Sequence, residues 1–246
     1  MAHRRSSPIT IKHGGVDSLS RSYPETHFKT PYVPHGSYDD RQIDPHTNAK
    51  GAGVIPYTYH NGELKFLLQK HIYPDIKKKR GWNDFGGSKD TGDSSAIEIA
   101  CREFAEETSC LFYLKEIDDE DSVQFYDEFK DNKLLEYSPE TIEKLIELIP
   151  EAKNYYINKC DIRPNYCSSG EVYITYFIKV KYIDASDIPR SEDMFKDYET
   201  RYMRECSWFT VNELLNIDNT SFSKRLQIMS IQNRIRNLLR NGRFEE

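Results

Sequence analysis

The segment 96–108 constrains the fold more than any other part of the chain. A helix over these residues turns by about 100° per residue. The residues that can pack on a sheet then gather on one side: Ile97, Ala100, Cys101, Phe104 and Thr108. Glu103, Glu106 and Glu107 gather within an arc of roughly 100° on another side, because they are spaced i, i+3, i+4. One helix is therefore expected to pack on a sheet and to present three carboxylates.

Strand-like runs lie on both sides of this helix. The runs 53–59 and 64–70 are joined by His60-Asn61-Gly62-Glu63, which predicts a tight hairpin because Asn-Gly tolerates positive φ angles. Four more strands are expected, at 110–114, 154–158, 172–182 and 203–210. A short helix over 211–215 and a long amphipathic helix over 221–239 follow the last strand. Mixed strands with a central and a terminal helix predict an α/β/α sandwich around a mixed sheet.

Two segments fall outside this pattern. Residues 1–48 are rich in His, Ser, Pro, Arg and Asp, and they predict an extended or partly disordered arm. The rest, 49–246, is read as one domain with a helical insert at about 117–150, whose clearest helix is 141–148. The apolar side of the insert is expected to face the fold, and its acidic part, which begins at Glu116, to point away.

Composition limits the class of protein. Of the 246 residues, 37% are hydrophobic and 30% charged, and no run of about eighteen apolar residues suggests a membrane span. The N-terminus lacks the apolar stretch of a secretory signal. Five cysteines without CxxC spacing favour reduced thiols in the cytoplasm, with the nucleus as the alternative, and argue against a zinc site.

The net charge of -6 speaks against a nucleic-acid coat protein but leaves room for local basic sites. Two basic stretches stand out, namely 77–80 and 224–243, and both are also compatible with solvated surface.

The three glutamates point to metal chemistry. Like charges at helical spacing repel by a few tenths of a kcal/mol per pair, and a divalent cation would reverse that repulsion. Magnesium takes oxygen ligands, usually one or two carboxylates, and completes its shell with water and phosphate oxygens. Arg102 could pair back to Glu98 or forward to Glu106 and hold the array in place. Spacing alone leaves the alternative of a solvated, Glu-rich helix face open.

The segment 87–110 resembles the Nudix box, which runs Gly, five residues, Glu, seven residues, Arg-Glu-apolar-any-Glu-Glu-any-Gly-apolar. Gly87 matches the first glycine. The core of the box is matched by Arg102, Glu103, Phe104, Glu106 and Glu107. There are three departures: Asp93 stands for the first glutamate, one extra residue precedes Arg102, and Ser109-Cys110 replace Gly-apolar. The resemblance covers roughly residues 50 to 240 and implies a Nudix hydrolase, that is, an enzyme that cleaves a phosphoanhydride bond.

The resemblance implies roles for residues of this chain. Glu103, Glu106 and Glu107 are the expected ligands of Mg²⁺, with Mn²⁺ as the alternative, and Arg102 completes the expected catalytic group. One of these glutamates, or Glu171 or Glu205 beside a strand, would activate water.

The resemblance to the Nudix box implies a type of reaction but does not identify the substrate. One hypothesis is a nucleoside-diphosphate-linked substrate, including the capped 5′ end of RNA, which needs an aromatic platform and basic residues. Aromatic candidates are Tyr57, Tyr59, Trp82, Tyr155, Tyr156 and Tyr166, each of which could equally be a packing residue. A diphosphoinositol polyphosphate would instead need a Lys/Arg cluster, such as Lys77, Lys78, Lys79 and Arg80 together with Lys89. The third hypothesis is a binding module of Nudix fold, without turnover, that recognises a nucleotide or a protein. The expected partners are thus a phosphate-rich small molecule or capped RNA, with no membrane and no identified protein partner.

Overall fold

The computed structural model describes residues 49–72, 81–117, 139–160, 165–168, 172–188 and 203–244. All of them belong to the compact unit Ser37–Glu246. The predicted arm 1–48, the basic run 77–80 and Glu171 lie outside the described residues. None of the described helices is both long and apolar enough to cross a membrane.

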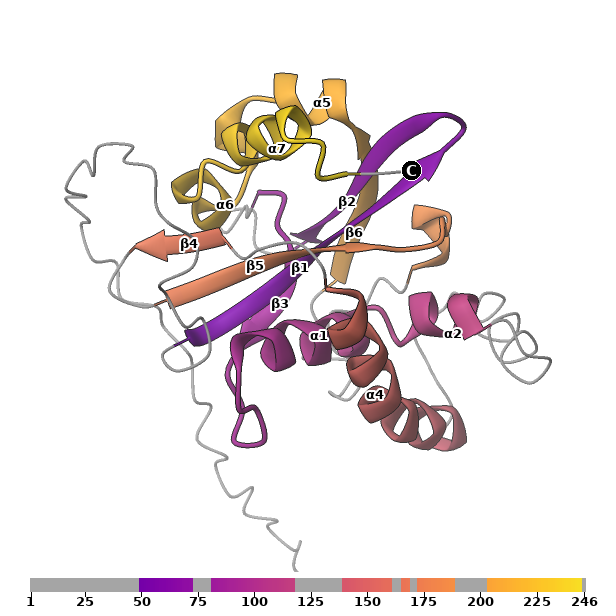
Figure 1. Ribbon diagram of the computed structural model, residues 1–246. Coiled ribbons are helices and arrows are strands. Elements are labelled where there is room, and N and C mark those ends of the chain that lie inside the picture. Colours follow the sequence, from indigo (N-terminus) through magenta and orange to yellow (C-terminus); the bar gives the residue numbers. More distant parts are fainter. Residues whose placement is uncertain are drawn as a thin grey trace, which may run out of the picture. The chain divides into compact units, whose positions relative to one another are not determined.

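A mixed six-stranded sheet forms the centre of the molecule (Figure 1). Its strands are β1 (Ala49–His60), β2 (Glu63–Ile72), β3 (Phe85–Ser88), β4 (Asn165–Ser168), β5 (Val172–Lys179) and β6 (Met203–Thr210). The order is β4-β5-β1-β2-β6, and β3 pairs with β1 off this path. Only the β1–β5 pairing is parallel among these ladders. The predicted hairpin is confirmed, with Asn61 and Gly62 at φ 55° and 75°.

The long strand β1 has two different partners along one edge. Residues 51–54 pair with β3, and residues 57–60 pair with β2. Gln69 of β2 forms an isolated antiparallel bridge with Asn83, which lies just before β3. We call this meeting point of Gln69, Asn83 and Asp84 the β2–β3 junction. It brings the strand before the box next to the residues that lead into the box.

Helices cover both faces of the sheet (Figure 1). One face carries α1 (Ala96–Glu107), α2 (Leu111–Ile117) and α4 (Pro139–Lys159), and the other carries α5 (Val211–Asn216), α6 (Lys224–Ile228) and α7 (Ile231–Arg240). Short 3-10 turns lie at Ala185–Asp187 and Asn219–Ser221. The side chains of β1 point alternately to the two faces of the sheet and so contribute to two separate cores. Ala52 and Val54 face α1 and α4, whereas Ile55 and Tyr57 face α5 to α7. The predicted α/β/α sandwich with a mixed sheet is confirmed.

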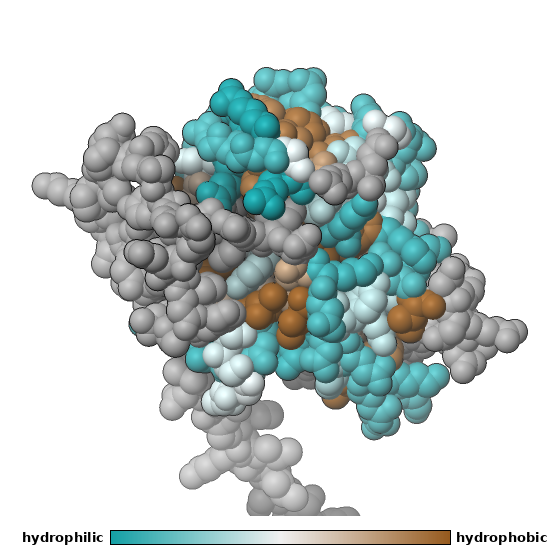
Figure 2. All heavy atoms as spheres, in the orientation of Figure 1, coloured by the Kyte–Doolittle hydropathy of each residue, from teal (hydrophilic) through white to brown (hydrophobic). Residues whose placement is uncertain are grey.

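Hydrophilic residues dominate the face seen in Figure 2, where apolar residues show in small separate groups. This distribution fits the two cores, which hold most of the large apolar side chains of the described residues. Among the described residues, the large apolar side chains that stay exposed are those of Ile72, Ile146 and Ile228.

The helix α1 matches its prediction closely. Ser95 caps it by accepting a hydrogen bond from the amide of Glu98. Phe104 anchors its buried side, with ring centroids 5.7 Å from Phe85 and 4.8 Å from Tyr156. Because these rings fix how the helix rotates on the sheet, they also fix where its glutamates point.

Three expectations about secondary structure are wrong. The run 110–114 is helical, because Ser109 and Cys110 reverse the chain and α2 then buries its apolar side. The run 154–158 belongs to α4, since burial at Leu145, Ala152 and Tyr156 follows a helical period that overrides the strand preference of adjacent tyrosines. The C-terminal helix is divided into α6 and α7 by Ser230, which has φ 50°. In contrast, the helix expected at 141–148 is confirmed as part of α4.

Candidate active site on α1

Arg102 stands at the centre of the charged face of α1. Its Nη1 lies 2.9 Å from Oε2 of Glu106 and 3.1 Å from Oε1 of Glu103. Its Nη2 donates to Oδ2 of Asp93 at 2.8 Å and to the carbonyl of Ser88 at 3.1 Å. One guanidinium therefore connects two box glutamates to the loop that precedes the helix.

The predicted pairing of Arg102 is confirmed in its forward direction only. Glu106 is a partner, but Glu98 instead accepts from the amide and the hydroxyl of Ser94 at the start of the helix. The backward partner is Asp93, the residue that replaces the first glutamate of the box. In this chain, the aspartate at that place binds the arginine of the box.

Asp93 is held in its ionised form. Burial opposes ionisation of this carboxyl, but hydrogen bonds from Arg102 and from the amide of Asp90 outweigh burial and lower the pKa of Asp93. The Asp90–Asp93 turn also closes on itself, because the amide of Asp93 donates to the carbonyl of Asp90 at 3.1 Å. The loop between β3 and α1 therefore has a defined shape although the box departs from its pattern there.

Glycine at position 87 makes room for Glu103. A Cβ atom on Gly87 would overlap the carboxyl group of Glu103, closer than real Cβ contacts allow. The carboxyl of Glu103 thus lies directly on the backbone of β3. Burial, which outweighs the opposing effect of Arg102, raises the pKa of Glu103 to about 7, and the charge of Glu106 adds to the rise.

Glu107 points inward, toward Gln69 of β2. Its Oε2 accepts a hydrogen bond from Nε2 of Gln69 at 2.8 Å, and the residue is only 6% exposed. Glu106 is the most exposed of the three box glutamates, with 30% of its side chain accessible to solvent. The three box glutamates therefore have different surroundings: Glu103 lies on β3, Glu106 faces solvent beside Arg102, and Glu107 is buried at the β2–β3 junction.

A second buried carboxylate, which no motif in the sequence marks, lies at the same junction. Asp84 is 0% exposed and accepts from the hydroxyl of Thr175 at 2.7 Å and from Nη2 of Arg225. The guanidinium of Arg225 also lies 3.9 Å from the ring centroid of Tyr173. Arg225 belongs to α6, so this ion pair connects the C-terminal helical layer to the residue before β3. The sequence signal was present only as one arginine within the basic stretch 224–243.

Comparison with known proteins gives one clear relative. Uncharacterized protein L534 of Acanthamoeba polyphaga mimivirus is 46% identical over 222 residues, which span 85% of this chain and 72% of that protein. The chain belongs to the family of L534. No family model matches the sequence.

Solved structures with a similar fold share little sequence with this member of the L534 family. An Ap4A hydrolase binary complex from C. elegans is 15% identical and has a TM-score of 0.41, covering 78% of this chain and 99% of that chain. The Nudix hydrolase RenU from M. smegmatis is 11% identical with a TM-score of 0.38, over 79% and 88% of the two chains. The Nudix domain of NrtR from Shewanella oneidensis, complexed with ADP ribose, is 16% identical with a TM-score of 0.34, over 80% and 94%. Likeness at this level does not carry an assignment of function, which has to rest on the site itself.

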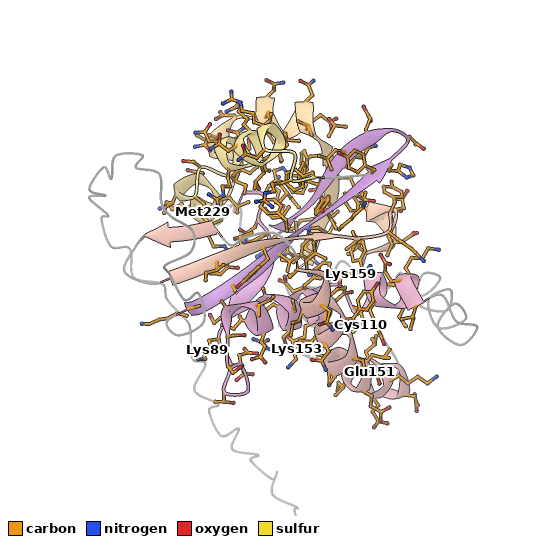
Figure 3. The ribbon with its side chains drawn as sticks, viewed as in Figure 1. Lys89, Cys110, Glu151, Lys153, Lys159 and Met229 are labelled. Carbon is orange, nitrogen blue, oxygen red and sulfur yellow. The ribbon has the colours of Figure 1, made fainter. Side chains whose placement is uncertain are left out.

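The candidate substrate-binding residues lie apart from one another in the described structure. Trp82 packs on the α5–α7 side of the sheet, with its ring 4.9 Å from that of Phe209 and the ammonium of Lys70 5.5 Å from its centroid. Lys89 is exposed just after β3, beside the loop that leads into α1 (Figure 3). Lys77, Lys78, Lys79 and Arg80 lie outside the described residues.

The other candidates behave mainly as packing residues. Tyr57 stacks edge-on against Phe244, and Tyr156 is fully buried in the core under α1. Tyr59 donates to the carbonyl of Phe244, and Tyr155 donates to Glu116. Glu205 is exposed on β6, where it pairs in register with Lys70.

The donor chemistry on α1 fits a hard divalent cation. Carboxylate oxygens are the ligands that Mg²⁺ takes, and the ion usually uses one or two of them together with water and substrate oxygens. Burial raises the pKa of Glu103 to about 7 although the neighbouring Arg102 opposes the rise, so a bound cation would stabilise the charged form of this carboxylate. Within the described ranges, no three His, Cys, Asp or Glu side chains converge into a ready-made cage.

Proposed function

We propose that this protein is a Mg²⁺-dependent hydrolase of Nudix type that cleaves a phosphoanhydride bond. The observation that carries the proposal is the arrangement of Glu103, Glu106 and Glu107 on one face of α1, with Arg102 joining two of them to Asp93. A face with this much negative charge at close range is stable with a cation bound. The substrate class that we favour is a nucleoside diphosphate linked to a second group, with the 5′ cap of RNA among its members.

In the proposed reaction, the residues of the α1 face and of the loop before it have different roles. Glu103, Glu106 and Glu107 would hold the cation, which neutralises the diphosphate and lowers the pKa of a bound water. Arg102 keeps Glu103 and Glu106 in place, because both share its Nη1. Glu106 is the carboxylate best placed to accept the proton of the attacking water, since it has the greatest access to solvent of the three. Lys89, exposed on the adjoining loop, would contact a phosphate.

The proposal is tested with a substrate panel. The full-length protein is incubated with MgCl₂ and with capped RNA, dinucleoside polyphosphates, nucleotide sugars and a diphosphoinositol polyphosphate, and the products are identified by mass spectrometry. We expect products cleaved between two phosphorus atoms, with ¹⁸O from labelled water on one of the phosphates, and no product in excess EDTA. Preference for the inositol substrate would keep the reaction and replace the substrate class. Binding of nucleotides without turnover of any panel member would replace the enzyme by a binding module.

A further inference from the structure

Gln69 is a buried amide of the sheet that contacts the box helix α1. It lies on β2, it is 1% exposed, and its Nε2 donates to Oε2 of Glu107 at 2.8 Å. The same Nε2 donates to the main-chain carbonyl of Asp84 at 2.9 Å. Both hydrogens of the amide group are thus used at the β2–β3 junction.

The orientation of this amide is set by its surroundings. Oε1 of Gln69 accepts from Nη1 of Arg204, which is itself 1% exposed. A flipped amide would turn its oxygen toward two acceptor oxygens and its NH₂ group toward a guanidinium, so only one orientation satisfies all three contacts. Arg204 therefore fixes which atom of Gln69 faces Glu107.

The backbone beneath Gln69 is held as firmly as its side chain. Its amide donates to the carbonyl of Asn83 at 3.0 Å, and its carbonyl accepts from the amide of Asn83 at 2.7 Å. On the other edge, β2 pairs with β6 and places Gln69 opposite Cys206. A side chain on such a backbone offers Glu107 a donor at a defined point.

We propose that Gln69 is a positioning residue that holds the carboxylate of Glu107 for a divalent cation, with Arg204 fixing the Gln69 amide. This inference rests on the proposed function. A neutral donor suits the task, because it restrains Glu107 without a positive charge that would compete with the cation for the carboxylate. The arrangement complements Arg102, which holds Glu103 and Glu106 from the opposite end of the helix face.

The test measures Mn²⁺ binding by electron paramagnetic resonance, so that it does not depend on knowing the substrate. Gln69→Met keeps the length of the side chain and removes the donor, and Glu107→Gln removes the carboxylate. We expect wild type to bind Mn²⁺ and Gln69→Met to weaken the affinity by about tenfold, as loss of a partner of a metal ligand does. Thr58→Val, which also replaces a buried polar side chain of the sheet, is the matched control and should keep the wild-type affinity.

The double variant separates positioning from a merely structural role. If Gln69 acts through Glu107, Gln69→Met should add no further loss in the Glu107→Gln background. Equal affinity of wild type and Gln69→Met, or additive losses in the double variant, would overturn the inference and leave the proposed function standing. Absence of Mn²⁺ binding by wild type would overturn the cation site and this inference together. Should Gln69→Met fail to fold, Gln69→Asn, whose amide is too short to reach Glu107, decides by the same two comparisons.

Discussion

At the end of α1, Ser109 stands where the box has a glycine, and its backbone has φ 53°. An L-residue in the left-handed region costs about 1–2 kcal/mol, of which glycine's larger backbone entropy offsets about 0.5–1. The hydroxyl of Ser109 is also buried and has no hydrogen-bond partner among the described residues. We therefore expect Ser109→Gly to raise the free energy of unfolding by about 1 kcal/mol and the melting temperature by roughly 2–4 °C.

Denaturant unfolding checks this expectation, with Ser109→Ala as the control that removes the hydroxyl and keeps the strained backbone. The alanine variant should gain less stability than the glycine variant. A glycine variant no more stable than wild type would show that the left-handed conformation carries no cost here.

Gly87 tests the contact between β3 and Glu103. The Cβ atom of Gly87→Ala would push against the Glu103 carboxyl, so we expect Mn²⁺ affinity and kcat to fall by about 10–100-fold. Gly92→Ala, in the loop that follows β3, is the matched control, because a Cβ atom there meets nothing within 4 Å. Equal losses in both variants, or none in either, would contradict the packing of Glu103 on Gly87.

The residues of the site follow from the sequence only in part. The spacing of the glutamates predicted a shared face, and the contacts of Arg102 with Glu103 and Glu106 agree with it. The partner role of Asp93 was not predicted, because it depends on how the loop folds back on the helix. Gln69 and Asp84 were missed for the same reason, since their contacts join residues that are distant along the chain.

Among the helices and strands, those with a clear periodic pattern of apolar residues were predicted best. The helix α1 and the strand β6 lie where the pattern placed them. The short strands β3 and β4 were missed, because four residues give too little pattern. The residues of α4 were predicted as a helix followed by a strand, because Tyr155 and Tyr156 favour a strand locally. They are helical because Tyr156 packs on Phe104 in the core, a contact that the local sequence does not reveal.

The elements α2 and α4 are joined by Glu116, which we expected from the sequence to point away from the fold. Its carboxylate instead accepts from Nζ of Lys159 at 2.9 Å, from the hydroxyl of Tyr155 at 3.1 Å and from the amide of Lys181 at 2.8 Å. Burial opposes ionisation, but these hydrogen bonds outweigh it and lower the pKa of Glu116 below its ordinary value of 4.5.

This shift makes the contribution of Glu116 depend on pH. Because the folded protein binds the proton less tightly than the unfolded chain, the contribution is present above pH 4.5 and is lost as the pH falls through the lowered pKa. We expect Glu116→Gln to lower the free energy of unfolding by about 1–2 kcal/mol at pH 7, and the difference from wild type to shrink in acid. Glu147→Gln, on the exposed side of α4, should show neither effect. A difference between wild type and Glu116→Gln that stays constant from pH 7 to pH 3 would contradict the assignment.

On the scale of the whole molecule, the sheet separates two cores, and the candidate site touches both layers. The glutamates come from α1 on one face, while Asp84 receives Arg225 from α6 on the other. Both layers and the class of fold were predicted from the sequence. For the basic stretch 224–243, which contains Arg225, a local basic site and solvated surface both stayed open, because a sequence shows charge and hydrophobic periodicity but not which side chain reaches another layer.

The central claim is that the carboxylate face of α1 drives phosphoanhydride cleavage with a divalent cation. The most direct measurement compares kcat of Glu106→Gln and Glu107→Gln with that of Glu98→Gln, with MgCl₂ and with excess EDTA. Glu98 lies on the same helix, but its carboxylate bonds to Ser94 at the helix start and not to Arg102. We predict that Glu106→Gln and Glu107→Gln each lose roughly 100-fold or more in kcat while keeping the wild-type melting temperature within a few degrees, that Glu98→Gln keeps the wild-type rate, and that EDTA abolishes cleavage. Undiminished cleavage by Glu106→Gln or Glu107→Gln, or by wild type in EDTA, would contradict the account.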